Sequence, residues 1–274
     1  MSETQPQPVI SFRKPPVIER VVGGLCTPDA NALASQMDRW TELVKERYPV
    51  VETVTNFEFN IAEKNGVPQL SSARPTIQIW HRHWRVNAKG EKMGCLQCRP
   101  DGFFVNIRRD STGTHSFDEL FREFQMWLPR WQETFSVAGF SGSRLLYVNE
   151  LSEDVTPQFI SSDRSLMIGK AIRVFANFVA PGPFGQLVLP YECRATIQLQ
   201  EPPGATLTLH TKAAKQPEGK PPAVYVEIQV QGRAGEGILS LQKLLEQCTL
   251  YHTNLLSGFR SIFTDEALAS FEPV

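Results

Sequence analysis

The segment that most constrains the fold is residues 95–109, which reads Cys-Leu-Gln-Cys-Arg-Pro-Asp-Gly-Phe-Phe-Val-Asn-Ile-Arg-Arg. Two runs typical of strands flank Arg-Pro-Asp-Gly at positions 99–102. Proline presets the first torsion of a turn, aspartate bonds its own backbone, and glycine accepts a positive φ. The segment therefore predicts a β-hairpin inside an antiparallel sheet.

The chain before and through this hairpin predicts five strands and one helix. The strands are expected at residues 17–26, 51–61, 76–86, 93–98 and 103–109. Thr27-Pro28 has the pattern of a helix start, with threonine as N-cap and proline at the first helical position. Apolar residues then recur at helical spacing until Pro49, which ends the helix.

The clearest helix follows the hairpin, over residues 117–135. Its apolar residues keep steps of three and four, which predicts one wide stripe facing a sheet; they are Phe117, Leu120, Phe121, Phe124, Leu128, Trp131 and Phe135. Ser116 and Glu119 have the spacing of a capping box. Pro129 is expected to kink or divide the helix.

The rest of the chain repeats a similar order of elements. A strand at residues 143–149 leads to a short helix around 165–177, then to strands at 186–200, 205–212 and 223–231, and to a final helix whose apolar stripe runs from Ile238 to Ile262. The sequence thus predicts an α+β protein: a mobile tail (1–14) and two units (15–140 and 141–274), each a curved antiparallel sheet packed on a long helix. If the two sheets joined, the result would be a saddle analogous to the TATA-binding-protein-like architecture.

Composition narrows the class of protein. The 274 residues carry a net charge of −1, with 28 basic and 29 acidic residues, which is not the balance of a strongly basic nucleic-acid-binding protein. The five scattered cysteines suit a reducing compartment better than a disulfide framework. The polar, proline-rich start lacks the layout of a signal peptide, and no apolar run has the length of a membrane span, so we expect a soluble cytoplasmic protein.

Several short motifs stand in a distinctive order along the chain: Pro15-Pro16-x-x-Glu19, Gln97-x-x-x-Asp101-x-Phe103-x-x-Asn106-x-Arg108 and Tyr147-Val148-Asn149. Together they resemble a sporadically distributed family of uncharacterised bacterial proteins. The family's Pro-Pro-x-x-Glu start and Gln-x-x-x-Asp-x-Phe-x-x-Asn-x-Arg hairpin match Pro15, Pro16, Glu19, Gln97, Asp101, Phe103, Asn106 and Arg108. Its Tyr-Val-Asn strand matches residues 147–149, and its last helix matches at His252, Phe259 and Phe263. The resemblance implies no established activity, and it implies a genomic association with mobile or defence-related genes. The chain departs from the family at Cys95 and Cys98.

The cysteine pair near His81 and His83 invites a zinc hypothesis, which strand geometry disfavours. A hairpin closed at residues 88–90 would place Trp84 opposite Met93. Since strand side chains alternate, His81, His83 and Cys98 would share one face and Cys95 would point to the other. A closed zinc site needs four converging ligands, so we expect free cysteines and no metal or other cofactor.

The strand Trp80-His81-Arg82-His83-Trp84-Arg85 suggests a second kind of site. Trp80, Arg82 and Trp84 would align on one face, as in surfaces that hold single-stranded nucleic acid. The simpler interpretation, which the net charge favours, is a sheet face on which arginine stems pack over tryptophan rings.

Four further residues could form either scaffold or site: Asn106, Arg108, Tyr147 and Asn149. Buried strand asparagines need partners, so we expect Asn106 and Asn149 to bond to each other across the two halves. His252 lies on an apolar helical stripe, where a core imidazole bonded to a backbone carbonyl is the expected role.

No catalytic triad, paired catalytic carboxylates or kinase signature is present in the sequence. The expected function is therefore a non-enzymatic binding or adaptor protein that acts through a protein partner or as a homo-oligomer, in bacterial defence or stress response. The alternatives are a nucleic-acid or nucleotide sensor using residues 80–85, and an enzyme with a pocket at Asn106, Arg108, Tyr147 and Asn149.

Overall fold

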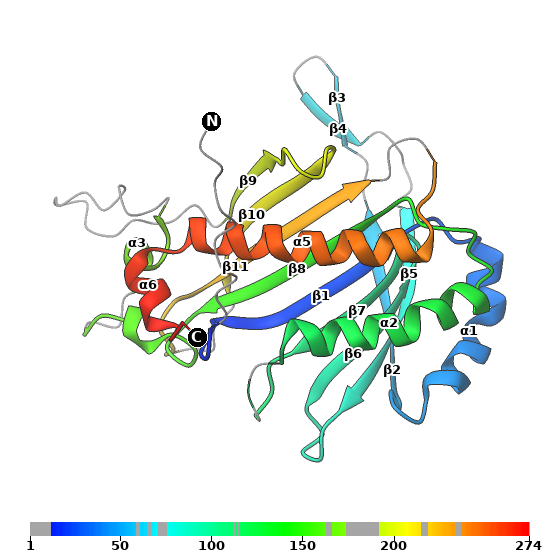
Figure 1. The fold of residues 1–274 in the computed structure, drawn as a ribbon, viewed down its shortest axis with the longest axis horizontal. Coiled ribbons are helices and arrows are strands. Elements are labelled where there is room, and N and C mark those ends of the chain that lie inside the picture. The colour runs from blue at the N-terminus through cyan, green and yellow to red at the C-terminus, as the bar shows by residue number, and fades with distance from the viewer. Residues whose placement is uncertain are drawn as a thin grey trace.

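The computed structural model describes residues 12–58, 61–64, 67–70, 76–111, 113, 115–162, 166–173, 192–214, 219–233 and 237–273. It is an α+β fold around a nine-stranded antiparallel sheet with strand order β2-β5-β6-β7-β1-β8-β11-β10-β9 (Figure 1). The strands are β1 (Val17–Leu25), β2 (Val50–Glu58), β5 (Thr76–Val86), β6 (Lys92–Arg99), β7 (Gly102–Arg108), β8 (Gly142–Leu151), β9 (Glu192–Gln198), β10 (Ala205–Ala214) and β11 (Ala223–Arg233). A separate hairpin pairs β3 (Ile61–Lys64) with β4 (Val67–Leu70).

The two halves of the chain meet at the centre of this sheet. β1 begins the first half and β8 begins the second, and the two strands pair antiparallel, with Val22 opposite Leu145. The sheets that the sequence predicts for the two halves are therefore parts of one continuous sheet.

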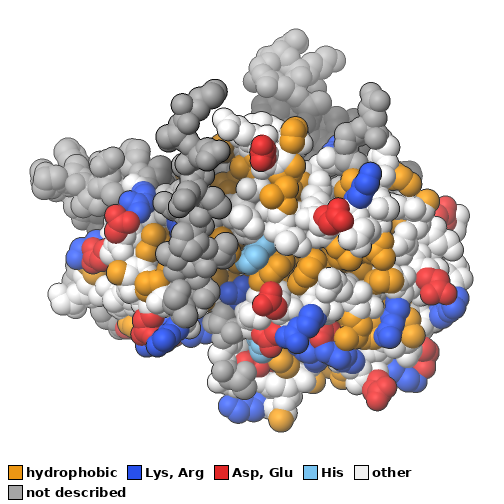
Figure 2. All heavy atoms as spheres, in the orientation of Figure 1, with side chains coloured by type: hydrophobic (Ala, Val, Ile, Leu, Met, Phe, Trp, Pro, Cys, Tyr) orange, Lys and Arg blue, Asp and Glu red, His pale blue; other side chains and the backbone are white. Residues whose placement is uncertain are grey.

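Three long helices lie on one side of the sheet: α1 (Ala30–Val44), α2 (Phe117–Thr134) and α5 (Leu241–Ile262) (Figure 1). We call this side the helix face. The short elements η1 (Pro157–Phe159), α3 (Ile168–Ala171) and α6 (Asp265–Ser270) lie at one end of the sheet. No helix of the described chain packs on the other side, which we call the open face. Figure 2 views the helix face, where hydrophobic, basic and acidic side chains are mixed.

Aromatic packing and one buried carboxylate join α1 and α2 to the sheet. The ring of Trp40 on α1 lies edge-on to Phe103 of β7 and to Trp127 of α2, at centroid distances of 5.8 and 6.0 Å. Glu123 of α2 is buried, accepts hydrogen bonds from Tyr48 (2.8 Å) and Trp127 (3.2 Å), and pairs with Arg47. A buried carboxylate is tolerated only with such partners, so this contact fixes α2 against the turn that follows α1.

The hairpin and the main helix are confirmed. β6 and β7 close at Arg99 and Gly102, and Gly102 has φ +145°, where a Cβ would lie 2.1 Å from the backbone oxygen of Gly24. The capping box of Ser116 and Glu119 is present. Pro129 lies inside α2, which runs unbroken from Phe117 to Thr134, so of the two expectations for this proline the division of the helix was wrong.

Other boundaries differ from the prediction. α1 begins two residues later than expected because Asp29, not Thr27, caps it: its carboxylate accepts a bond from the backbone N–H of Ala32 at 2.9 Å. α5 begins at Leu241, which leaves Ile238 outside the helix and exposed. The helix expected at 165–177 appears as the four-residue α3, with 165 and 174–177 outside the described residues. Of the predicted tail, residues 12–14 bond to the backbone of the last residues of the chain, and 1–11 lie outside the description.

Candidate functional site

The open face gathers five of the seven residues that the sequence singles out. Arg82 lies opposite Gln97, and Glu19 lies opposite Arg108, so alternate side chains of β1, β5, β6 and β7 point to the same side. This side carries Trp80, Arg82, Trp84, Asn106 and Arg108.

Tyr147 and Asn149 point the other way, to the helix face. The hydroxyl of Tyr147 lies 2.8 Å from Nδ1 of His252 on α5. The partner of His252 is thus a tyrosine hydroxyl and not the backbone carbonyl that the sequence suggested. The proposed enzymatic pocket at Asn106, Arg108, Tyr147 and Asn149 is wrong, because the sheet separates the first two side chains from the last two.

Three aromatic rings on the open face each carry two cationic side chains. Arg82 and Arg99 lie over Trp80 at 6.0 and 5.4 Å, Lys92 and Arg108 lie over Trp84 at 4.8 and 6.0 Å, and Arg99 and Arg144 lie over Phe104 at 4.8 and 5.4 Å. These separations fit cation–π contacts. We call these eight residues the cation–ring layer: Trp80, Arg82, Trp84, Lys92, Arg99, Phe104, Arg108 and Arg144.

The cations cover the rings. Trp80, Trp84 and Phe104 are only 9%, 6% and 1% exposed, whereas the cations are half-buried or exposed. The indole of Trp84 also donates a hydrogen bond of 2.7 Å to Glu52. The rings therefore serve as a platform that orients the charged groups toward solvent.

Carboxylates compensate only part of this charge. Arg99 makes a two-bond contact with Asp101 (2.8 and 3.1 Å), Lys92 lies 3.6 Å from Glu52, and Arg108 lies 3.9 Å from Glu19.

Two cations of the layer instead bond to amide oxygens. Arg82 donates to Gln97 at 3.3 Å and Arg144 donates to Gln231 at 2.8 Å. Neither pairs with a carboxylate of the described chain. Five cations against three contacting carboxylates make this part of the surface positive in a chain whose net charge is −1.

The two asparagines do not bond to each other. Asn106 accepts a bond from Gln97 (2.7 Å) and donates one to Glu19 (2.5 Å), while Asn149 donates to the backbone oxygen of Val226 (2.9 Å). β1 lies between their strands, and the two side chains point to opposite faces of the sheet. The predicted pairing is therefore wrong, and Asn106 instead links Gln97 to Glu19, the carboxylate that lies 3.9 Å from Arg108.

The cysteine pair is divided between the faces, as expected. Trp84 lies opposite Cys95 and His81 opposite Cys98, a register two residues away from the predicted one. Since a shift of two preserves the faces, Cys98 still points to the helix face and Cys95 to the open face. Burial raises the pKa of both thiols. Within the described ranges, no three His, Cys, Asp or Glu side chains converge as metal ligands.

Sequence inspection missed Lys92, Arg99, Phe104 and Arg144. The alternation of side chains along a strand could have placed two of them on the open face. Arg99 follows Gln97 by two positions, and Phe104 precedes Asn106 by two. Arg144 could not be found in this way, because it reaches the layer only through the pairing of β8 with β1.

Comparison of the chain with protein-family models, with curated proteins and with solved structures gave no match. Among the helices that the structure describes, none is long and apolar enough to cross a membrane. The geometry of the site therefore carries the functional proposal.

Proposed function

We propose that this chain is a non-enzymatic binding protein whose open face holds a single-stranded nucleic acid. The observation that carries the proposal is the cation–ring layer, in which five cations lie over three rings on a sheet face that no helix of the described residues covers. Backbone phosphates supply the negative charge that these cations attract, and flexible single strands can follow a sheet surface.

Arg82 and Arg144 are the strongest candidates for phosphate contact, because amides and not carboxylates hold them. A phosphate can approach them without displacing an acidic partner. Their guanidinium planes also lie over rings, so the long side chains are already ordered and less conformational entropy is lost on binding.

The low exposure of the rings sets the mode of binding. A base cannot stack directly on Phe104, which is 1% exposed, unless Arg99 or Arg144 moves away. Bases would instead stack on the outer faces of the guanidinium groups. Affinity should then depend on the arginines more than on base identity.

The test is a salt series of binding to a labelled oligothymidylate, measured by fluorescence anisotropy. Arg82→Gln and Arg144→Gln should each weaken binding and lower the slope of log affinity against log salt by about 0.7. Arg122→Gln is the matched control, because Arg122 is an exposed cation on α2, on the helix face. Equal effects of all three variants, or no binding at low salt, would exclude the open face as a nucleic-acid site.

The second candidate is the adaptor function, for which the edge strand β2 gives support. β2 pairs with β5 on one side and has no partner strand on the other within the described chain. Val50 and Val51 on this strand are 38% and 45% exposed. A long edge with exposed apolar residues is suited to strand addition by a protein partner or a second copy. Val51→Lys should abolish such association, as measured by the molar mass of the complex in light scattering.

We further propose that the sheet forms a TATA-binding-protein-like saddle, supported by the strand order, which extends outward from the central β1–β8 pair in both halves. Small-angle scattering would test the curved profile that a saddle requires.

The free state of all five cysteines supports a cytoplasmic location. A role in bacterial defence rests on the motif resemblance, and phage challenge of cells with and without the gene would test it.

A further inference from the structure

A cavity of about 280 Å³ lies on the helix face, opposite the cation–ring layer. Its floor comes from Arg20 on β1 and Tyr147 on β8, which are paired across the centre of the sheet. Phe117 of α2 and Phe259 of α5 form apolar walls. The cavity thus combines hydrophobic surface with the guanidinium of Arg20, a group that usually pairs with an anion when buried.

Arg20 has no carboxylate partner in the described part of the chain. It donates from Nη1 to the backbone oxygen of His115 and lies 5.1 Å from the ring centroid of Tyr147, while its buried Nε has no hydrogen-bond partner. Glu119 attracts the guanidinium of Arg20 electrostatically but does not bond to it. The Glu119 carboxylate instead accepts a hydrogen bond of 2.7 Å from the backbone N–H of Ser116.

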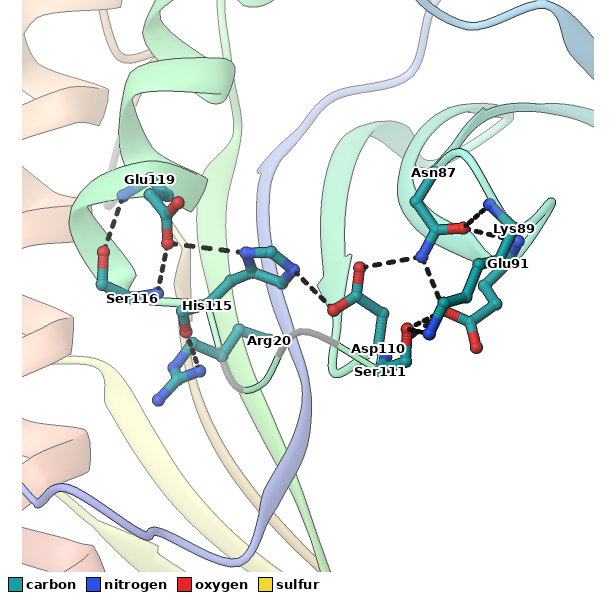
Figure 3. Close-up of polar contacts among 9 residues, drawn as sticks. All are labelled: Arg20, Asn87, Lys89, Glu91, Asp110, Ser111, His115, Ser116 and Glu119. Carbon is teal, nitrogen blue, oxygen red and sulfur yellow. Dashed lines mark hydrogen bonds and ion pairs between the residues drawn. The ribbon is translucent and has the colours of Figure 1, made fainter.

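The backbone that holds Arg20 is itself fixed. Figure 3 shows His115 between two carboxylates: its ring nitrogens lie 3.7 Å from Asp110 and 3.6 Å from Glu119. Asp110 in turn accepts a bond of 3.3 Å from Asn87, in the loop between β5 and β6. The carbonyl that accepts from Arg20 is therefore anchored from two sides, so the guanidinium is oriented before any ligand arrives.

His252 completes the polar side of the cavity without adding charge. Its ring stacks on Phe117 at a centroid distance of 3.8 Å and bonds to the Tyr147 hydroxyl. Burial, together with the positive charge of Arg20, lowers the pKa of His252 to about 4. At neutral pH, Arg20 is the cation of the cavity floor, and the lining also carries Arg13 and Asp118, whose opposite charges offset each other. The remaining excess of one cation suits a ligand with a single negative charge.

We propose that this cavity binds a small organic monocarboxylate, with the carboxylate on the guanidinium of Arg20 and an apolar body against Phe117 and Phe259. The planar guanidinium matches a carboxylate in geometry, and the phenyl rings match an apolar or aromatic body. The site is independent of the nucleic-acid proposal, because the two lie on opposite faces of the sheet.

Benzoate is the probe, and benzamide is its uncharged counterpart of the same shape. Titration calorimetry on the full chain should show saturable binding of benzoate. Benzamide should bind at least about tenfold more weakly, because it cannot form the charged contact with the guanidinium of Arg20. Arg20→Gln should weaken benzoate by a similar factor, whereas Arg122→Gln on the exposed side of α2 should not.

Because Arg20→Gln could also disturb the sheet, a second measurement uses the unmodified protein. Benzoate should shift the NMR signals of the Arg20 Nε–H group and of the His252 ring. Equal affinity for benzoate and benzamide, unchanged signals at saturation, or no binding in the millimolar range would each overturn the proposal.

Discussion

The ring of Phe104 lies directly on the backbone of Gly23. The two residues are opposite each other on β7 and β1, and a Cβ placed on Gly23 would lie 2.1 Å from Cδ1 of the Phe104 ring. Only glycine, which has no Cβ, leaves room for the ring, so the residue at position 23 determines how closely the Phe104 ring approaches the backbone of β1. Since Arg99 and Arg144 both lie over that ring, Gly23 also sets the position of two cations.

Replacing Gly23 with alanine should therefore destabilise the fold and weaken binding on the open face. The expected cost is about 1–3 kcal/mol in the free energy of unfolding, the usual range for overpacking. Urea denaturation measures the first effect, and the oligothymidylate assay measures the second.

The double variant Gly23→Ala with Phe104→Leu provides the control. A smaller side chain removes the clash, so the double variant should lose less stability than the sum of the single variants. Strict additivity would show that the ring is not what Gly23 accommodates.

The apolar stripe of α2 should account for much of the core stability. Phe124 is fully buried and stacks with Phe103 at a centroid distance of 6.4 Å, so Phe124→Ala should cost about 3–5 kcal/mol in urea denaturation. Met126, two positions along the same helix, is 39% exposed. Its replacement by alanine should stay within about 0.5 kcal/mol, and a similar cost for both variants would contradict the assignment of faces.

Local patterns were sufficient to predict the elements whose signals lie close together in sequence. The turn at 99–102 and the capping box of Ser116 and Glu119 are both contained in four residues, and both were predicted correctly. The start of α1 was not, because Thr27-Pro28 and Asp29 offer competing caps and the choice depends on which side chain reaches a free N–H.

The candidate site could be predicted only in part, because it depends on pairing between distant strands. Alternation correctly put Trp80, Arg82 and Trp84 on one face. The contribution of Arg144 requires knowing that β8 lies beside β1, and the separation of Asn106 from Asn149 depends on the same arrangement. Net charge was uninformative about the open face, since it averages over surfaces that differ in sign.

Asn106 should be energetically coupled to Gln97 and not to Asn149. Replacing Asn106 with alanine leaves the amide of Gln97 and the carboxylate of Glu19 without a bond, at a cost of about 1–3 kcal/mol. In a double-mutant cycle, Asn106→Ala with Gln97→Ala should show a coupling of at least about 0.5 kcal/mol, and Asn106→Ala with Asn149→Ala should be additive within about 0.5 kcal/mol. The reverse result would mean that the two asparagines are energetically coupled through the sheet.

The stability of the protein should fall between about pH 6.5 and pH 4 because of His83. This side chain is fully buried, lies 3.0 Å from the hydroxyl of Thr41, and has a pKa lowered to about 4, first by burial and then by the nearby His81. The unfolded chain binds a proton on this histidine at a higher pH than the folded protein does. Acidification through this window therefore favours unfolding, whereas above about pH 6.5 the effect is absent.

One such histidine contributes a slope of at most about 1.4 kcal/mol per pH unit to the free energy of unfolding, and the buried His252 adds to it in the same direction. His83→Gln keeps a polar group facing Thr41 but cannot titrate. The variant should be less stable than the wild type near pH 7, and the difference should shrink as the pH falls toward 4, as followed by urea denaturation at a series of pH values. Parallel curves for the two proteins would show that His83 binds its proton at the same pH in the folded and the unfolded chain, and so would contradict the lowering of its pKa by burial.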